Sequence, residues 1–247
     1  MALAWLDLMG TTPVERPVSS WFKPWNPLYR DLADRFLLAR RFLPVKGTVV
    51  EAGCGAGFGA KIMKISPPEI HYFGFDVSVE AIQEARGLAD WGLFFVASIL
   101  CPPIVSETAD LTICFETLEH LECSQQPDAL RELARITRSG GTLLVSVPSR
   151  QFHVGLPNPF HIGLRDDDDW RDLIARSRWR IERLFGQNRV WHKGYLIAKH
   201  AYRLFPLLGR LLWLPHAYLR CLLHIPSVES YRAGRSYRNL LFQCTKT

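Results

Sequence analysis

The sequence predicts an α/β fold built on a mostly parallel sheet of seven strands, with helices on both faces. Short apolar runs rich in β-branched residues alternate with helix-compatible segments over residues 47–147. The first run leads into a glycine-rich turn, Gly53 to Gly59, and a helix-compatible segment leaves that turn. The second run ends at Asp76, and a parallel sheet would place this strand end beside the glycine turn, at the edge where ligands bind.

The first helix is expected over residues 26–42, because Asn26 and Pro27 offer an N-cap followed by proline at the first helical position. The aromatic and proline-containing stretch before it, residues 1–25, is expected to pack against the sheet edge; closing over a ligand is the alternative. The expected strands of the parallel core are 48–52, 71–76, 93–97, 109–115 and 142–147, with helices over 58–66, 79–88 and 125–137 between them and a turn at 138–141.

After the parallel core, four aspartates at 166–169 open a helix that runs to about residue 177, where their charges oppose the positive end of the helix dipole. Residues 179–185 and 238–244 are the expected last two strands. The expected organisation is a lead-in and helix over 1–45, a ligand-binding domain over 46–186, a helical cap inserted at 187–236 and the final strand at 237–247.

The insertion at 187–236 contains apolar stretches broken by three prolines, which predicts two or three short amphipathic helices. A cap that contacts the substrate is the favoured role. A homodimer surface and a face that makes peripheral contact with a membrane are the other roles that this composition allows.

Composition sets broad limits. The 247 residues carry a net charge of +6, a mild excess that is more often a solvated surface than a nucleic-acid site. Six cysteines are scattered without a C-x-x-C pair, which indicates buried thiols in a reducing compartment. No run approaches the ~18 apolar residues of a membrane-spanning helix, and the first nine residues lack the basic region of a signal peptide. A cytoplasmic protein is expected.

The glycine turn alone is compatible with two ligands. Gly55 to Ala60 satisfies the G-x-G-x-x-G/A dinucleotide fingerprint, and Asp76 follows at about the distance of a ribose-binding carboxylate. A dinucleotide-binding oxidoreductase is therefore one interpretation. The acidic residue before the first glycine, in Glu51-x-Gly53-x-Gly55-x-Gly57, distinguishes this turn from that fingerprint.

Four segments appear in the order expected of a class I S-adenosylmethionine (SAM) dependent methyltransferase, which the sequence resembles over about residues 45–185. They are Glu51 to Gly57, Phe75 to Ser78, Ala109 to Leu121 and Leu130 to Leu143. The local sequences of these segments resemble those of one branch of the family, which contains the ubiquinone-biosynthesis O-methyltransferases and the type 11 and 12 methyltransferases. The resemblance implies a Rossmann-like fold, SAM as cofactor and transfer of a methyl group to a small-molecule acceptor. The segment Glu116-x-x-Glu119-His120 is not expected of a dehydrogenase.

The resemblance also implies roles for single residues. The turn would hold the amino-acid and ribose portions of SAM, Asp76 would accept both ribose hydroxyls, and Phe115 and Glu116 would line the methyl-transfer channel. The family usually has an acidic residue at the position of Ser98, so adenine recognition is expected to depend more on Ile99. The cofactor-binding residues that the resemblance implies are Glu51, Gly53, Cys54, Gly55, Gly57, Asp76, Val77, Ser98, Ile99 and Phe115.

The spacing of Glu116, Glu119 and His120 is i, i+3, i+4, so a helical segment would place them on one face. Together with His161 they could hold a divalent cation such as Mg²⁺. The Glu-x-x-Glu-His motif resembles the one in Mg²⁺-assisted small-RNA methyltransferases. Without a metal, Glu119 would form local hydrogen bonds and a histidine would act as general base. The expected catalytic residues are His120 first, then His161, with Glu116 at the channel.

The function that these observations favour is SAM-dependent O-methylation of an apolar or amphipathic small molecule. An Mg²⁺-assisted RNA methyltransferase is the second interpretation, motivated by the basic charge and the acidic and histidine residues after the fourth strand. A non-catalytic protein that keeps the SAM-binding fold is the third.

Overall fold

The computed structural model describes residues 27–63, 65, 69–152, 158–190, 227–232 and 236–247. The helical segments are α2 (Pro27–Ala39), η2 (Arg40–Phe42), α3 (Phe58–Met63), α4 (Val79–Leu88), η3 (Leu118–His120), α5 (Gln126–Ile136), η4 (Arg150–Phe152) and α6 (Asp167–Ala175). The strands are β1 (Gly47–Ala52), β2 (Ile70–Asp76), β3 (Leu93–Val96), β4 (Ala109–Phe115), β5 (Thr137–Pro148), β6 (Trp179–Val190), β7 (Val228–Ser230) and β8 (Ser236–Lys246).

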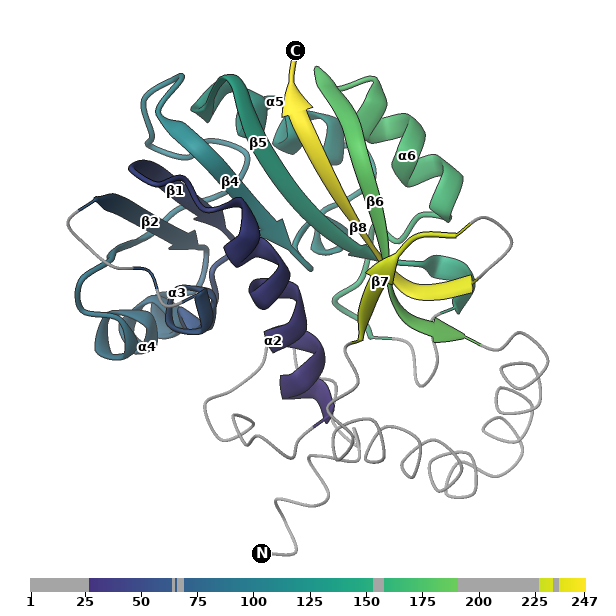
Figure 1. Cartoon of the computed structure of the whole chain (residues 1–247), viewed down its shortest axis with the longest axis horizontal. Coiled ribbons are helices and arrows are strands. Elements are labelled where there is room, and N and C mark those ends of the chain that lie inside the picture. The colour runs from purple at the N-terminus through teal and green to yellow at the C-terminus, as the bar shows by residue number, and fades with distance from the viewer. Residues whose placement is uncertain (1–26, 64, 66–68, 153–157, 191–226, 233–235) are drawn as a thin grey trace, which may run out of the picture.

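The strands form one twisted sheet in the order β3-β2-β1-β4-β5-β8-β6-β7 (Figure 1). Strands β1 to β5 are parallel to one another, and β8 lies antiparallel between β5 and β6. The parallel core confirms the predicted fold class. An antiparallel strand inserted next to β5 distinguishes the sheet from the doubly wound dinucleotide fold, whose order is 3-2-1-4-5-6.

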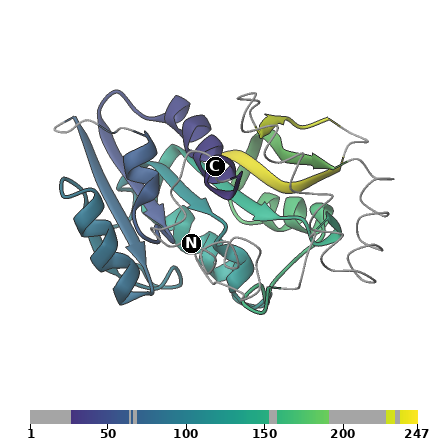
Figure 2. The same ribbon diagram turned by 90° about the horizontal axis from the view of Figure 1, so that it is seen from below.

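Two hydrophobic layers cover the sheet. One contains buried side chains of α2, α3 and α4, among them Phe36, Met63 and Ile82. The other contains buried side chains of α5 and α6, including Leu133 and Trp170. Figures 1 and 2 show α2 on the opposite side of the sheet from α5 and α6. Because both faces of the parallel strands are covered, their side chains are apolar on both sides, which explains the continuous apolar runs in the sequence.

The helix at 167–175 forms as predicted, with Asp166 at the N-cap position and three aspartates in its first turn. The predicted turn at 138–141 was wrong, because these residues already belong to β5. Within the described residues the sheet has eight strands instead of the predicted seven. The additional strand is β7, a three-residue strand that pairs with β6.

The predicted helical insertion at 187–236 lies largely outside the described residues. At its two ends the chain is extended: β6 continues to Val190, and β7 and β8 occupy 228–230 and 236–246. The predicted lead-in over 1–25 also lies outside the described residues. None of the described helices is long and apolar enough to cross a membrane.

The cysteines agree in part with the predicted burial. Cys54, Cys114 and Cys244 are buried free thiols, whereas Cys101 and Cys123 are exposed. Burial raises the pKa of the Cys54 thiol far above its usual value, so this side chain stays protonated and is no nucleophile.

Candidate active site

A cavity of about 330 Å³ opens at the carboxyl ends of β1, β2 and β4. Five parts of the chain form its wall: helix α2, the glycine turn, the end of β2, the segment after β4 and the loop around His161. The lining includes Arg35, Phe36, Glu51, Gly53, Cys54, Gly55, Asp76, Val77, Phe115, Glu116, Thr117, Glu119, His120, Asn158 and His161.

The glycine turn is fixed to the neighbouring strand by its backbone. The N–H groups of Gly53 and Cys54 both donate to the carbonyl oxygen of Phe75, at 2.8 and 3.0 Å. Gly53 has φ +72° and a Cβ there would collide with the side chain of Thr117, whereas Gly55 has φ +51° and open space where its Cβ would be. Glycine is therefore required at residue 53 by packing, and at residue 55 by backbone conformation and by access to the cavity.

Asp76 is held with its carboxylate against this turn. Its Oδ2 accepts the N–H of Gly55 at 2.9 Å, and its Oδ1 accepts the N–H of Ser78 at 3.0 Å. Each carboxylate oxygen has further lone pairs. The side chain lines the cavity, so those lone pairs can accept hydrogen bonds from the two hydroxyls of a ribose. The structure thus brings Gly55 and Asp76 together as predicted.

Glu51 lies beneath the turn and is almost fully buried. The hydroxyl of Tyr72 donates to its carboxylate. Burial, and to a lesser extent the nearby charge of Asp76, raises the pKa of Glu51 well above its usual value. Its carboxyl group therefore resists ionisation until a cation, such as a ligand ammonium group, comes close.

Glu116 follows β4 in a left-handed conformation, with φ +49°. Its carboxylate accepts hydrogen bonds from Ser146 Oγ at 2.7 Å and Asn239 Nδ2 at 2.6 Å, and it forms an ion pair with Arg35 Nη1 at 3.2 Å. Three donors from three different elements hold this side chain. The prediction that it shares a helical face with Glu119 and His120 was wrong, because the helical turn η3 begins only at Leu118 and is a 3₁₀ turn.

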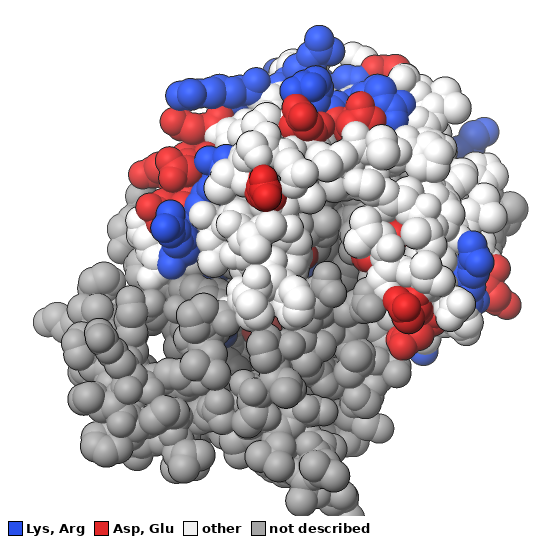
Figure 3. Space-filling view, turned by 180° about the vertical axis from the view of Figure 1, so that it is seen from behind, with Lys and Arg blue, Asp and Glu red and all other residues white. Residues whose placement is uncertain are grey.

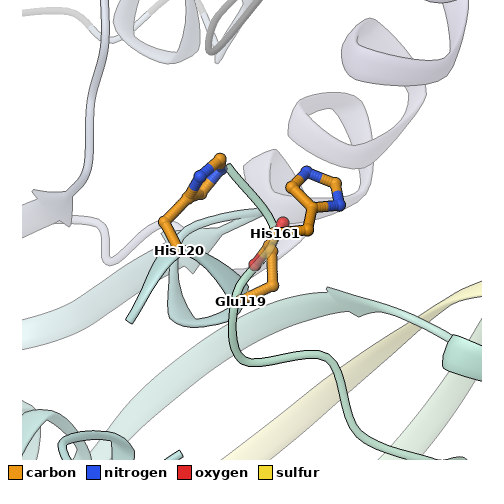
Figure 4. Close-up of side chains that lie close together, drawn as sticks. All are labelled: Glu119, His120 and His161. Carbon is orange, nitrogen blue, oxygen red and sulfur yellow. The ribbon is translucent and has the colours of Figure 1, made fainter. Parts of the chain in front are cut away.

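Glu119, His120 and His161 form the second group of ionisable side chains in the cavity (Figure 4). One potential ligand atom of each lies within 4.8 Å of the others. The imidazole rings of His120 and His161 meet edge to face, with their centroids 5.0 Å apart. Three of the four predicted metal ligands therefore converge, and Glu116 does not belong to this group.

Glu119 has no exposed surface, and neither carboxylate oxygen has a hydrogen-bond partner among the described residues. Burial above all, and then the charge of Glu116, raises its pKa well above the usual value, so the uncharged form is favoured. His120 Nδ1 lies 3.1 Å from the carbonyl oxygen of Phe160. Because a carbonyl only accepts, this contact requires the proton on Nδ1 and leaves the lone pair of the neutral ring on Nε2.

The chemistry of this group does not suit Mg²⁺, which prefers an all-oxygen shell. One carboxylate and two imidazoles are donors typical of transition metals. The comparisons reported below give no support to a divalent cation.

Three predicted cofactor residues do not line the cavity. Gly57 packs closely against Ala85 of α4, Ile99 belongs to the hydrophobic core, and Ser98 accepts the N–H of Leu100 at 3.2 Å through its hydroxyl. Eight cavity residues were missed: Leu32, Arg35, Phe36, Ala56, Phe58, Gly59, Thr117 and Asn158. Arg35 had a signal in the sequence, since it lies between Leu32 and Phe36 on the apolar side of the first helix.

The model of a family described as "Methyltransferase domain" matches residues 25–198 of this chain. The chain belongs to the class I SAM-dependent methyltransferases. The match extends over strands β1 to β6, the glycine turn, Asp76 and the residues around His120. It also confirms the resemblance on which the sequence-based assignment depended.

Related methyltransferases support the assignment. The chain is 30% identical over 158 residues to a probable SAM-dependent methyltransferase of Mycobacterium tuberculosis, covering 62% of this chain and 53% of that protein. It is 28% identical over 187 residues to a similar protein of Mycolicibacterium smegmatis, covering 73% and 68%. A SAM-dependent methyltransferase of Thermotoga maritima has the same fold, with a TM-score of 0.64 at 17% identity over 92% of this chain and 94% of that one. The chain thus spans about half the length of the first of these relatives.

Proposed function

We propose that this methyltransferase transfers a methyl group from SAM to an oxygen atom of an apolar or amphipathic small molecule. The proposal depends on one observation: Asp76 accepts the N–H of Gly55 at the rim of the cavity. Because residue 55 is glycine, no Cβ projects into the cavity at this point. A nucleoside ribose requires a paired acceptor of this kind, and the open space at Gly55 allows a ligand to lie against the backbone.

The residues present fit SAM in three further respects. Val77 gives an exposed apolar surface beside Asp76 for a purine ring, and Glu51 lies under the turn for an amino group. Phe115 and Glu116 follow at the end of β4. When bound, SAM supplies a methyl group on a sulfonium, whose neutral thioether is the leaving group. The protein then has to orient the acceptor, exclude water and accept a proton.

His120 is the proposed base. With Nδ1 committed to the carbonyl of Phe160, its Nε2 carries the lone pair that accepts a proton from an acceptor hydroxyl. The His161 ring packs against it and keeps its orientation. Glu116 is proposed as a positioning residue, because its carboxylate is already bound by three donors.

The names of two relatives support the proposal: one is an O-methyltransferase, and the other is named for a small-molecule acceptor. The chain is 29% identical over 119 residues to the malonyl-[acyl-carrier protein] O-methyltransferase of Serratia marcescens. It is 27% identical over 173 residues to the trans-aconitate 2-methyltransferase of Paracidovorax citrulli. Leu32, Phe36 and Phe115 give the cavity an apolar side that suits a hydrocarbon portion of the acceptor.

An RNA acceptor has less support. Figure 3 shows lysine and arginine side chains intermixed with acidic ones on the face that it presents. Several basic side chains of the described residues are paired with acids, for example Arg138 with Asp110 at 2.6 Å and Lys246 with Glu107. The described residues in this view therefore form no unbroken cationic surface of the kind that binds phosphates.

The proposal is tested by calorimetry with S-adenosylhomocysteine and by transfer of a labelled methyl group from SAM to a panel of hydroxy and carboxylic acids, in the presence and absence of EDTA. We expect binding of S-adenosylhomocysteine and EDTA-insensitive transfer to oxygen. Absence of binding would overturn the assignment. Binding without transfer to any acceptor would favour a non-catalytic protein, and loss of transfer in EDTA would favour a metal at Glu119, His120 and His161.

A further inference from the structure

Glu51 and Tyr72 lie diagonally across two neighbouring strands. Val49 of β1 pairs with Tyr72 of β2, and Glu51 follows Val49 by two residues, so it lies on the same face of the sheet. A long aromatic side chain can reach such a diagonal neighbour. Here the Tyr72 hydroxyl donates to the Glu51 carboxylate. The contact therefore joins the strand that enters the glycine turn to the strand that ends at Asp76.

The ring of Tyr72 is fixed by the hydrophobic core. The side chain belongs to a residue that is only 3% exposed. Its ring meets the edge of Trp91 at a centroid distance of 5.7 Å and packs against Phe94 at 5.8 Å. Close packing on two sides restricts the ring, so the hydroxyl stays directed at Glu51. Tyr72 itself does not line the cavity, whereas Glu51 does.

The carboxylate of Glu51 has room beside α3 because residue 59 is glycine. A Cβ at Gly59 would lie 2.5 and 2.6 Å from the two carboxylate oxygens. The carboxylate is thus packed against the first turn of α3 and held by Tyr72 from β2. These two contacts come from the layers around the cavity and determine where the carboxylate lies in its wall.

The environment of Glu51 opposes its charge until a ligand binds. Burial and the neighbouring charge of Asp76 both raise the pKa of Glu51. A hydrogen bond donated to a carboxylate favours the ionised form, and so does a nearby cation. The Tyr72 hydroxyl and a ligand ammonium group would therefore stabilise the same charged state of the same side chain.

We propose that Tyr72 is a positioning residue of the cofactor site: its hydroxyl orients the Glu51 carboxylate, and the pair selects ligands that carry a free amino group. The inference rests on the proposed function, in which Glu51 lies under the glycine turn for the amino group of SAM. Because Tyr72 lies outside the cavity lining, its effect on a ligand passes through Glu51. The ribose contact at Asp76 does not involve Tyr72.

The test compares two ligands that share an adenosine and a thioether. S-adenosylhomocysteine carries the amino-acid portion, and 5′-methylthioadenosine lacks it. Calorimetry on the whole chain gives the dissociation constants of both for the wild type, Tyr72→Phe, Glu51→Gln and the double variant. Tyr72→Phe should weaken S-adenosylhomocysteine binding by at least about tenfold, the effect of one hydrogen bond to a charged group. Its affinity for 5′-methylthioadenosine should be unchanged.

The double variant shows whether Tyr72 acts through Glu51. If it does, the two substitutions are not additive, and the double variant binds S-adenosylhomocysteine as weakly as Glu51→Gln alone. Tyr231→Phe is the matched control, since it removes a phenol hydroxyl from a residue that stacks on Arg171 and does not line the cavity. It should leave both affinities unchanged.

Three results would overturn the inference: Tyr72→Phe binds S-adenosylhomocysteine as the wild type does, it loses affinity for both ligands equally, or its effect adds fully to that of Glu51→Gln. The second result would indicate a purely structural role. In all three the wild type still binds S-adenosylhomocysteine, so the proposed function stands. Failure of the wild type to bind S-adenosylhomocysteine would refute the proposed function instead.

Discussion

Replacement of Gly55 by valine tests the cofactor site with a control in the same chain. Gly55 and Gly140 have similar left-handed conformations, with φ of +51° and +71°, and neither has an atom within 4 Å of the place where a Cβ would be. The backbone cost of a side chain is therefore similar at both, about 1–2 kcal/mol or more of unfolding free energy. Gly55 faces the cavity at the carboxyl ends of the parallel strands. Gly140 is exposed near the start of β5, at the amino ends of these strands.

We expect Gly55→Val and Gly140→Val to lose similar unfolding free energy in urea denaturation. Only Gly55→Val should also lose affinity for S-adenosylhomocysteine, because its side chain occupies space that the ligand needs. Overpacking of about 1–3 kcal/mol corresponds to about a 5- to 150-fold weaker affinity in calorimetry. Equal affinity in the two variants would refute the placement of the ligand against the glycine turn.

Three further substitutions test other parts of the site. Asp76→Ala should weaken S-adenosylhomocysteine binding by at least about tenfold, since it removes a charged acceptor of two hydroxyls; unchanged affinity in calorimetry would contradict this. Tyr72→Phe should lower the unfolding free energy by about 1–3 kcal/mol, because it leaves the buried carboxyl of Glu51 without its donor, and an unaltered urea midpoint would argue against that contact. The pKa of Glu119 is raised, so its contribution to stability is present below its usual value of 4.5 and is lost as pH rises toward the folded-state value. Glu119→Gln cannot ionise and should become more stable relative to wild type as pH rises, by up to about 1.4 kcal/mol per pH unit; a pH-independent difference in unfolding free energy would show that Glu119 is already charged, for example by a bound cation.

The cofactor half of the site could be predicted from the sequence because its geometry is local to two adjacent parallel strands. The end of β1 leads directly into the glycine turn, and Ala52 pairs with Phe75 in β2. This register brings Asp76 beside Gly55, and the contact does not depend on segments that are distant in the sequence. The fold of the parallel core was predictable for the same reason, since each apolar run and each helix follows its own periodicity.

The acceptor half could not be predicted, because its partners come from distant segments. Glu116 is bound by Ser146, Asn239 and Arg35, which lie on β5, β8 and α2. Their meeting depends on the antiparallel insertion of β8, which no local pattern specifies. The assumption of a regular helix after β4 also failed, since the backbone at Glu116 is left-handed and only the 3₁₀ turn from Leu118 to His120 is helical.

The extension of β6 beyond Phe185 was missed because it lacks apolar alternation. Polar contacts hold it in place: Gln187 donates to the carbonyl oxygen of Asp31 at 2.7 Å, and Asn188 donates to the Asp31 carboxylate at 2.6 Å. A strand stabilised by amide side chains against a helix gives no periodic hydrophobic signal. The same contacts fix α2 and, with it, Arg35.

The position of β8 between β5 and β6 has a consequence for the order of assembly. During translation β5 and β6 emerge well before residue 236, yet each can pair on its inner side only with β8. Until β8 is made, both present open backbone edges of the kind that promote intermolecular pairing. Asn239 also arrives with that strand, so a growing chain acquires a sheet prone to aggregation before it acquires a complete binding pocket.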